Sequence, residues 1–287
     1  MGVSAIRLGG GAALSAARDA GDRPGPAAEA PTGLARRWAY GLVKAFDGLL
    51  VGGRWPRLDA WLTAQEGRGS DFIFLQIGAN DGVVHDPIHA HVRRAGWRGV
   101  LVEPSARYFA RLQENYRGVP GLTFVHAAIG ARAESRTLYR IADGCDFRPA
   151  WTQGIASFDR EVLLSHRRVV PGIEAYIVTE EVRAMTLASL LAAPGDPAAG
   201  QTGWQGAGIE CIKRLDLLLV DTEGHDYEVI RQIPFAHLAP SVIVYEHKHL
   251  DRASRRACRA LLAGHGYRLA RHWSNTLAWL PERAGPL

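Results

Sequence analysis

A glycine-rich turn and a later acid have the residue types and the spacing of a nucleoside-binding site. The turn, Gly78-Ala79-Asn80-Asp81-Gly82, directly follows the apolar run 72–77. Its glycines allow the backbone to turn sharply and to approach a ligand without a Cβ in the way. Glu103, which is followed by Pro104, lies 21 residues after Gly82. An acid about 20 residues beyond such a turn can accept hydrogen bonds from both hydroxyls of a ribose.

The charge of Asp81 discriminates between nucleoside cofactors. A dinucleotide site needs G-x-G-x-x-G, so that bare backbone N–H groups meet a diphosphate, whereas this turn reads G-A-N-D-G. Unit charges about 4 Å apart interact by roughly 4 kcal/mol at an effective dielectric near 20. The Asp81 carboxylate would therefore repel a diphosphate and attract a cation. S-adenosylmethionine carries a sulfonium and an ammonium and no phosphate, so the turn favours it over a nicotinamide dinucleotide.

Acidic side chains and one imidazole gather after a later apolar run, 216–220. Transfer of a methyl group to a hydroxyl benefits from a base that removes the hydroxyl proton. His225 has a suitable ordinary pKa, and Asp221, directly after the run, has the better expected position. Glu223 is the third candidate, and Glu246-His247 forms a second candidate pair. Asp226 has a competing interpretation, as the cap of the helix that follows.

Apolar runs alternating with amphipathic segments predict the elements that position these residues. We expect an α/β fold, Rossmann-like, with a mostly parallel seven-stranded sheet, helices on both faces and an antiparallel strand near the C-terminus. An irregular section, 143–170, and a loop, 194–209, interrupt the pattern. The predicted strands are 72–77, 99–102, 122–127, 135–141 (antiparallel), 175–178, 216–220, 242–245, 267–270 and 276–280, and the predicted helices are 87–95, 106–116, 187–191, 227–233 and 252–263.

The N-terminal part of the chain differs in composition from the rest. Residues 1–32 are rich in Ala, Gly and Pro, which predicts a disordered tail. Residues 33–69 read as a helical extension and 70–287 as the catalytic domain. Within 34–62 the apolar spacing is helical with a basic side, which favours a helix that caps the domain or makes a dimer contact over a membrane-surface helix.

Charge and cysteine content narrow the partners and the compartment. The net charge is +5, but residues 71–250 carry 18 basic and 21 acidic side chains, which argues against a nucleic-acid groove through the site. Cys145, Cys211 and Cys258 are odd in number and far apart. Such cysteines suit a reducing cytoplasm rather than a disulfide framework or a cysteine metal site. Three histidines, His85, His89 and His91, favour a solvated helix face over a metal site.

Four motifs, taken together with their order along the chain, resemble those of the FkbM family of methyltransferases. The resemblance covers about residues 70–280 and also includes the step at Thr186-Leu187 and the segment 275–279. The motifs are Gly78-Ala79-Asn80-Asp81-Gly82, Val102-Glu103-Pro104-Ser105, Val125-His126-Ala127-Ala128-Ile129-Gly130 and Leu219-Val220-Asp221-Thr222-Glu223-Gly224.

The resemblance implies a class I, S-adenosylmethionine-dependent enzyme of a mostly bacterial family that largely O-methylates sugars or polyketide-type natural products. It implies that the turn, Glu103, Pro104 and Ala128 hold the cofactor and that Asp221 faces the methyl group and the acceptor. Two residues depart from the pattern. Gln76 replaces an acid common in the first motif, so Asp81 or Asp221 would pair with the cofactor's ammonium, and Ala188 replaces an Asp whose role this chain leaves open.

Other functions remain as alternatives to a small-molecule or glycan O-methyltransferase. They are a nicotinamide-dependent oxidoreductase, a nucleic-acid methyltransferase and a non-catalytic Rossmann-like module docked through residues 34–62. The turn sequence counts against the first. Amino-methylating enzymes often have an Asn- or Asp-Pro-Pro-aromatic loop where this chain has Asp221-Thr222-Glu223-Gly224, which counts against the second. An intact turn beside Glu103 counts against the third.

Overall fold

The main sheet has the predicted seven strands and one antiparallel member. The computed structural model describes residues 56–145, 150–192, 214–285 and 287. The strand order is β10-β11-β9-β8-β1-β2-β3, and only β11 runs against its neighbours. The strands are β1 (Ile73–Ile77), β2 (Arg98–Val102), β3 (Leu122–Val125), β8 (Leu217–Val220), β9 (Val242–Glu246), β10 (Arg268–His272) and β11 (Asn275–Trp279).

Helices cover both faces of this sheet because its central strands are apolar on both sides. In β8, Leu218 and Val220 pack on one face with Val229 and Leu262, while Leu217 and Leu219 pack on the other face. The first face is covered by α6 (Leu187–Ala192), α7 (Asp226–Ile230) and α8 (Arg252–Gly264), and the second by α2 (Pro56–Gln65), α3 (His89–Ala95) and α4 (Ala106–Asn115). The predicted fold class is confirmed.

The N-terminal part of the described chain joins the same core. In α2, Leu58, Trp61 and Leu62 are buried against Phe72, the residue before β1, and Trp61 Nε1 donates to the carbonyl of Ala284 at 3.0 Å. The predicted tail 1–32 and most of the predicted extension 33–69, including most of the helical pattern in 34–62, lie outside the described residues. The domain bounds therefore stay a prediction.

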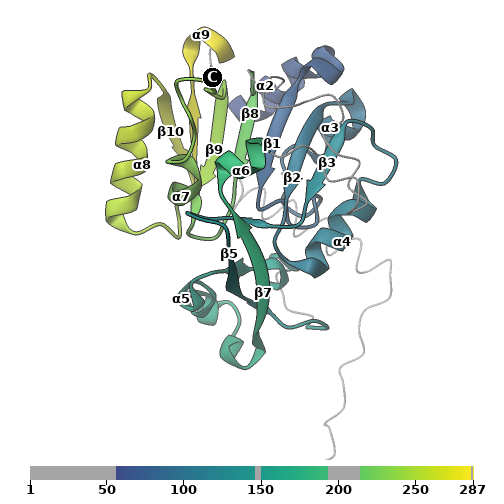
Figure 1. Ribbon diagram of the computed structural model, residues 1–287, viewed down its shortest axis with the longest axis vertical. Coiled ribbons are helices and arrows are strands. Elements are labelled where there is room, and N and C mark those ends of the chain that lie inside the picture. Colours follow the sequence, from purple (N-terminus) through teal and green to yellow (C-terminus); the bar gives the residue numbers. More distant parts are fainter. Residues whose placement is uncertain (1–55, 146–149, 193–213, 286) are drawn as a thin grey trace, which may run out of the picture.

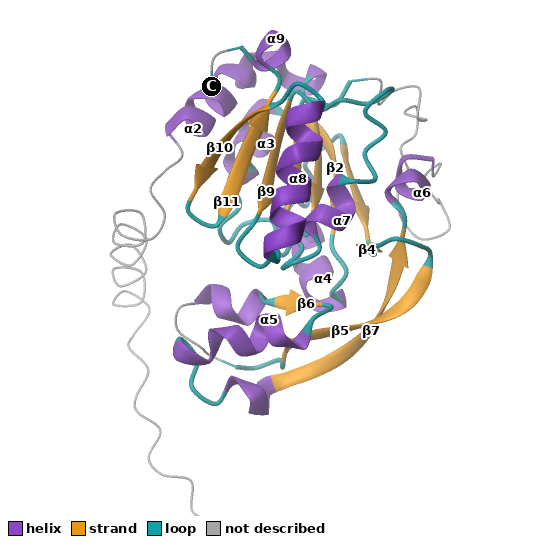
Figure 2. Ribbon diagram, turned by 90° about the vertical axis from the view of Figure 1, so that its left-hand side faces the viewer, coloured by secondary structure: helices purple, strands orange, loops and turns teal. Residues whose placement is uncertain are grey.

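A second, four-stranded sheet lies below the main sheet in Figures 1 and 2. Its order is β4-β7-β5-β6, and β5 pairs antiparallel with β7 over eight residue pairs, from Glu134↔Ala184 to Ile141↔Ile177. The bounds are β4 (Ala128–Ile129), β5 (Glu134–Ile141), β6 (Ala156–Ser157) and β7 (Ile177–Met185). The sequence predicts the antiparallel strand β5 but not the sheet to which it belongs.

Two segments of this small sheet differ from the sequence prediction. The predicted strand 175–178 is wrong at its start, because 3₁₀ helix η4 (Ile173–Tyr176) precedes β7, which continues to Met185. Four of the nine residues of β7 are polar and six are at least partly exposed, so it lacks the continuous apolar signal of a buried strand. The predicted irregular section 143–170 contains η2 (Ala150–Gly154), β6, α5 (Arg160–Leu164) and η3 (Ser165–Arg168). Asp159 caps α5 by accepting from Glu161 N at 2.9 Å.

Within the described residues, the chain has no helix that combines the length and the apolar character needed to cross a bilayer.

Candidate active site

The turns after β1 and β8 meet backbone to backbone at the carboxyl edge of the sheet. Gly78 has φ +81°, and a Cβ there would lie 1.8 Å from the carbonyl oxygen of Asp221. The N–H groups of Gly78 and Ala79 both donate to the carbonyl of Val102, at 2.9 and 3.0 Å, and Asp221 N donates to Ile77 at 2.9 Å. These hydrogen bonds hold the ends of β1, β2 and β8 together. The backbones can approach this closely because residue 78 has no Cβ.

The remainder of the glycine turn is held by its own side chains and by α4. Gly82 has φ +69°, and a Cβ there would lie 2.6 Å from the side chains of Leu112 and Tyr116. Asp81 Oδ1 accepts from the N–H groups of Val83 and Val84, both at 2.9 Å. One oxygen of Asp81 thus stabilises the turn. The predicted pairing of Asp81 with the cofactor's ammonium needs Oδ2 and stays a prediction.

Glu103, at the end of β2, faces this turn and is 5% exposed. Its Oε2 accepts from Asn80 N at 2.8 Å and its Oε1 from Ser105 N at 2.9 Å. Desolvation raises the pKa of Glu103 to about 7, although both backbone hydrogen bonds act in the other direction. A carboxylate oxygen can accept two hydrogen bonds. Both oxygens therefore retain capacity for the two ribose hydroxyls that the sequence predicts as their partners.

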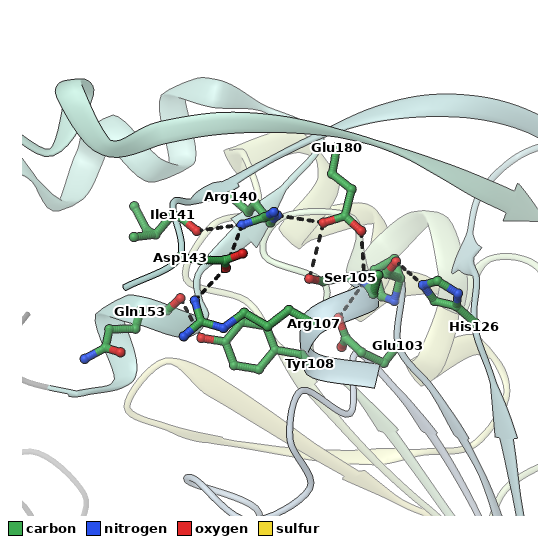
Figure 3. Close-up of polar contacts among 12 residues, drawn as sticks. Glu103, Ser105, Arg107, Tyr108, His126, Arg140, Ile141, Asp143, Gln153 and Glu180 are labelled. Carbon is green, nitrogen blue, oxygen red and sulfur yellow. Dashed lines mark hydrogen bonds and ion pairs between the residues drawn. The ribbon is translucent and has the colours of Figure 1, made fainter. Parts of the chain in front are cut away.

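The small sheet is bonded to the segment that follows Glu103 (Figure 3). Glu180 on β7 accepts from the N–H of Ala106, the first residue of α4, at 2.8 Å, and from Arg140 Nε at 2.6 Å. Tyr108 of α4 donates through its hydroxyl to the carbonyl of Gln153 at 2.7 Å. His126 Nε2 lies 3.0 Å from the carbonyl oxygen of Pro104. The small sheet thus positions the predicted ribose-binding segment.

Two other predicted cofactor-site residues have mainly structural surroundings. Ala128 is 6% exposed in β4, paired with Ala184 and packed against Leu138 and Val182. Asn80 adopts φ +51°, a left-handed conformation that is uncommon outside glycine and that clusters at functional sites. Its Nδ2 donates to the carbonyl of Gly154 at 3.2 Å, which links the turn to η2. The roles predicted for both residues remain untested.

Gln76, the departure from the first motif, is buried and half satisfied. Its Nε2 donates to Asp86 Oδ2 at 3.2 Å, while its Oε1 is a buried acceptor with no hydrogen-bond partner among the described residues. Desolvation raises the pKa of Asp86 to about 6. No sequence pattern points to Asp86, because its contact with Gln76 depends on how the loop folds back. A carboxyl group therefore lies behind the amide that replaces the usual acid.

Four carboxyl groups converge at the ends of β8 and β9: Asp221, Glu223, Asp226 and Glu246. Asp221 is exposed, and the protein atoms around it nevertheless desolvate its carboxyl group and raise its pKa. Desolvation raises the pKa of Glu223 and Glu246 as well, and the charge of Asp221 adds to both shifts. Lys248, which is exposed, opposes these shifts through its ammonium.

Asp226 is fully buried, and its capping interpretation is wrong. The residue at the N-cap of α7 is His225, and Asp226 is the first helical residue. Asp226 Oδ1 accepts from Glu246 N at 2.9 Å, and Oδ2 accepts from Thr222 Oγ1 at 2.9 Å. Desolvation and then the charge of Asp221 raise its pKa to about 8. Asp226 therefore ties the loop after β8 to the end of β9.

Glu223, Glu246 and His249 form a tighter group within this region. Glu223 adopts φ +48°, the second non-glycine residue of the site with a left-handed backbone. Its Oε2 lies 3.2 Å from His249 Nε2, which in turn lies 3.9 Å from Glu246 Oε2. The sequence singles out Glu223 and Glu246 separately, but it gives no reason to join them to His249.

The two predicted histidine bases are differently placed. His225 Nε2 lies 3.2 Å from an amino nitrogen of Arg136, and desolvation together with the Arg136 charge lowers the pKa of His225. His247 is 5% exposed, with Nδ1 3.0 Å from Thr276 Oγ1 and Nε2 3.0 Å from an Arg271 nitrogen. His247 therefore supports β11 and does not act as a pair with Glu246. Whether His225 is a base stays a prediction.

The histidines of the 85–91 segment do not share a solvated face. His91 is 9% exposed, stacks on Trp97 with a ring separation of 5.5 Å and bonds Glu66 Oε1 through Nδ1 at 2.5 Å. His89 packs against Tyr116 at 4.9 Å. The predicted solvated helix face is therefore wrong for His89 and His91, because α3 packs on the sheet with these two rings inward.

A comparison with curated proteins finds no match. Among solved structures, precorrin-6y C5,15-methyltransferase from Geobacter metallireducens GS-15 is 13% identical, with 78% of this chain and 87% of that chain covered and a TM-score of 0.35. The methyltransferase FkbM from Methylobacillus flagellatus KT is 12% identical, with 72% and 43% covered and a TM-score of 0.40. Fibrillarin from Aeropyrum pernix, solved with natively bound S-adenosyl-L-methionine, is 11% identical, with 74% and 66% covered and a TM-score of 0.34.

The family comparison is decisive. The model described as the methyltransferase FkbM domain matches residues 76–269, which is more than half of the chain and includes the glycine turn, Glu103 and the carboxyl groups after β8. It confirms the predicted resemblance and the predicted cofactor, and it decides against the nicotinamide-dependent oxidoreductase. The chain belongs to the FkbM family of S-adenosylmethionine-dependent methyltransferases.

Proposed function

We propose that this enzyme methylates a hydroxyl group of a sugar, a glycan or a small natural product. The observation that carries the proposal is the position of Asp221, an exposed residue whose carboxyl group has a raised pKa and whose backbone lies directly against Gly78 of the predicted donor turn. A base is most effective when its pKa approaches the operating pH. A carboxyl group poised in this way suits removal of a hydroxyl proton as the oxygen is methylated.

The residues around the glycine turn fit the cofactor. Glu103 would accept from the ribose hydroxyls, and the unpartnered Oε1 of Gln76 is a buried acceptor suited to the cofactor's ammonium. When bound, S-adenosylmethionine supplies an electrophilic methyl group on a sulfonium. The chain's own contribution is to align the acceptor oxygen with that methyl group, to exclude water and to take up one proton.

The region around Asp221 is rich in carboxyl groups and includes a partly exposed aromatic ring. Carboxyl groups offer no attraction to a phosphate backbone, which supports a small neutral acceptor over a nucleic acid. Trp151 of η2 is partly exposed, with Lys248 Nζ 5.7 Å from its ring centroid. A partly exposed ring beside charged groups offers an apolar face and polar partners together, which suits a polyhydroxylated acceptor. The unpaired Cys145 and Cys258 agree with action in a reducing compartment such as the cytoplasm.

The proposal is tested by separating donor binding from transfer. Asp221→Asn should retain S-adenosylhomocysteine binding by calorimetry and lose transfer of radiolabelled methyl groups to a panel of glycosides and hydroxylated natural products by about 10²–10⁴-fold. Glu174→Gln, an exposed acid on η4, is the control and should match the wild type. Transfer that is unchanged in Asp221→Asn would exclude Asp221 as the base. Transfer to nucleic acid alone would exclude the acceptor class.

A further inference from the structure

Three side-chain atoms beside Asp221 have the arrangement of metal ligands. Glu223 Oε2, Glu246 Oε2 and His249 Nε2 all lie within 4.8 Å of one another. They come from the loop after β8, the last residue of β9 and the loop beyond it. Because β8 and β9 are adjacent, with Val220 paired to Tyr245, both loops leave the sheet at the same level.

The same three atoms are buried without hydrogen-bond partners among the described residues. Glu246 is 8% exposed, and so is the His249 side chain. Leaving buried polar atoms unpaired costs about 1–3 kcal/mol each, and more for charged groups. His249 Nε2 approaches both carboxylates without the geometry of a hydrogen bond. A cation placed between the three atoms would satisfy all of them at once.

The separations suit a single ion. Bonds from zinc to nitrogen and oxygen are about 2.0–2.2 Å long, so two donors on a tetrahedral ion lie about 3.4 Å apart. His249 Nε2 lies 3.2 Å from Glu223 Oε2 and 3.9 Å from Glu246 Oε2. Small rotations of the carboxyl groups would complete the geometry, and three protein ligands leave a further position open.

The charge of the region also favours a cation. Asp221, Glu223, Asp226 and Glu246 face one ammonium, that of Lys248, whose Nζ lies 3.2 Å from His166 Nε2. When Glu223 and Glu246 are ionised, a divalent ion between them would neutralise both charges. Buried charges are generally paired or coordinate metals.

We propose that Glu223, Glu246 and His249 bind one divalent cation of the zinc or manganese class at the acceptor end of the site. Two carboxylates with one imidazole form a mixed oxygen and nitrogen donor set, which suits these ions better than magnesium or calcium, whose sites are built from oxygen. The ion's role rests on the proposed function. With its open position, it binds the acceptor hydroxyl and eases loss of its proton to Asp221.

The binding test uses the full chain, free of affinity tags and stripped with a chelator. Titration with Zn²⁺ or Mn²⁺ in a calorimeter should show one ion per chain, and Mg²⁺ should bind more weakly. Glu246→Gln and His249→Gln should weaken binding by at least about 100-fold, since loss of even supporting groups around a metal costs 10–100-fold. His237→Gln and Glu282→Gln, two exposed side chains elsewhere, are the matched controls and should bind like the wild type.

A second measurement does not depend on the stability of the variants. Pulsed electron paramagnetic resonance of Mn²⁺ bound to the wild-type chain should show coupling to an imidazole nitrogen. The site is overturned by an absence of stoichiometric binding, by equal binding in both ligand variants, or by a bound ion without nitrogen coupling.

The role of the ion is tested separately from the donor site. S-adenosylhomocysteine binding should persist in the presence of chelator, whereas methyl transfer should fall at least about tenfold and recover on adding Zn²⁺ or Mn²⁺. Transfer that is unaffected by the chelator would overturn the role, even with an ion bound. Loss of S-adenosylhomocysteine binding in the wild type, with or without metal, would instead count against the proposed function.

Discussion

Glu180 of β7 accepts a hydrogen bond from the backbone N–H of Ala106 at 2.8 Å. A residue of the small sheet thus caps the first turn of a main-sheet helix, a role for which Ser105, at the N-cap, makes no side-chain bond. The free N–H groups of a first helical turn favour a nearby carboxylate. Because Ala106 follows Glu103 closely, this contact also positions the predicted ribose-binding carboxylate.

Removing that cap should weaken both the fold and the donor site. We expect Glu180→Ala to lower the free energy of unfolding by about 1 kcal/mol and to weaken S-adenosylhomocysteine binding several-fold, measured by denaturant titration and calorimetry. Glu181→Ala is the control, because Glu181 bonds the side chains of Ser135 and Thr137 and not α4. Equal effects of the two variants on ligand binding would contradict a specific role for Glu180.

The ribose-binding role of Glu103 can be separated from its structural role. Glu103→Ala removes the acceptor of both Asn80 N and Ser105 N as well as of the ribose. Hydrogen bonds to a charged group contribute about 1.5–3 kcal/mol each, so we expect the dissociation constant for S-adenosylhomocysteine to rise at least about 100-fold. The dissociation constant of Glu103→Gln should lie between those of the wild type and Glu103→Ala, since an amide has one oxygen acceptor. An unchanged dissociation constant in Glu103→Ala would show that this carboxylate does not contact the cofactor.

Position 78 should tolerate no side chain. Gly78→Ala places its Cβ inside the carbonyl of Asp221, a backbone group that cannot rotate away, so we expect a loss of several kcal/mol in unfolding free energy. Gly172→Ala is matched in conformation, with φ +74°, but a Cβ there meets nothing within 4 Å. It should cost only about 1–2 kcal/mol, the strain of the left-handed backbone. Similar losses in the two variants would contradict the close approach of the turns.

The buried Asp226 should make stability fall as the pH rises. Its pKa is raised from 3.8 to about 8, so between these values the folded state binds more protons than the unfolded state, and unfolding becomes easier with increasing pH. Asp226→Asn keeps an acceptor for Glu246 N and a donor toward Thr222. We expect the variant to match the wild type near pH 4 and to exceed its melting temperature above pH 8. A wild-type advantage at high pH would refute this assignment.

The sequence predicts the main sheet well because its central strands are buried on both faces. Runs such as 217–220 and 242–245 are continuously apolar, and the helices between the strands have clear amphipathic spacing. The small sheet is harder to predict, since β7 presents Glu180, Glu181 and Arg183 to polar partners or solvent. Its polar residues follow no alternation that distinguishes a strand from a loop.

The site is predictable where it is local and unpredictable where it depends on neighbouring strands. The glycine turn and the acids after β8 are contiguous motifs. The group of Glu223, Glu246 and His249 arises only because β8 and β9 are adjacent and in register. Adjacent residues can also diverge, as when Glu246 faces the carboxyl cluster while His247 contacts Thr276 of β11. Tertiary packing, and not the local sequence, determines which way each of these side chains points.

Strand β5 sets the spacing between two contacts that the small sheet makes with the main domain. Its residue Leu138 pairs with Glu180, which holds α4, and the next residue, Tyr139, pairs with Ser157, whose hydroxyl donates to the carbonyl of Glu223 at 2.7 Å. The two anchors are one step apart on a single strand. A slip of one residue would turn side chains to the opposite face, and it would break both the contact of Glu180 with Ala106 and the contact of Ser157 with Glu223.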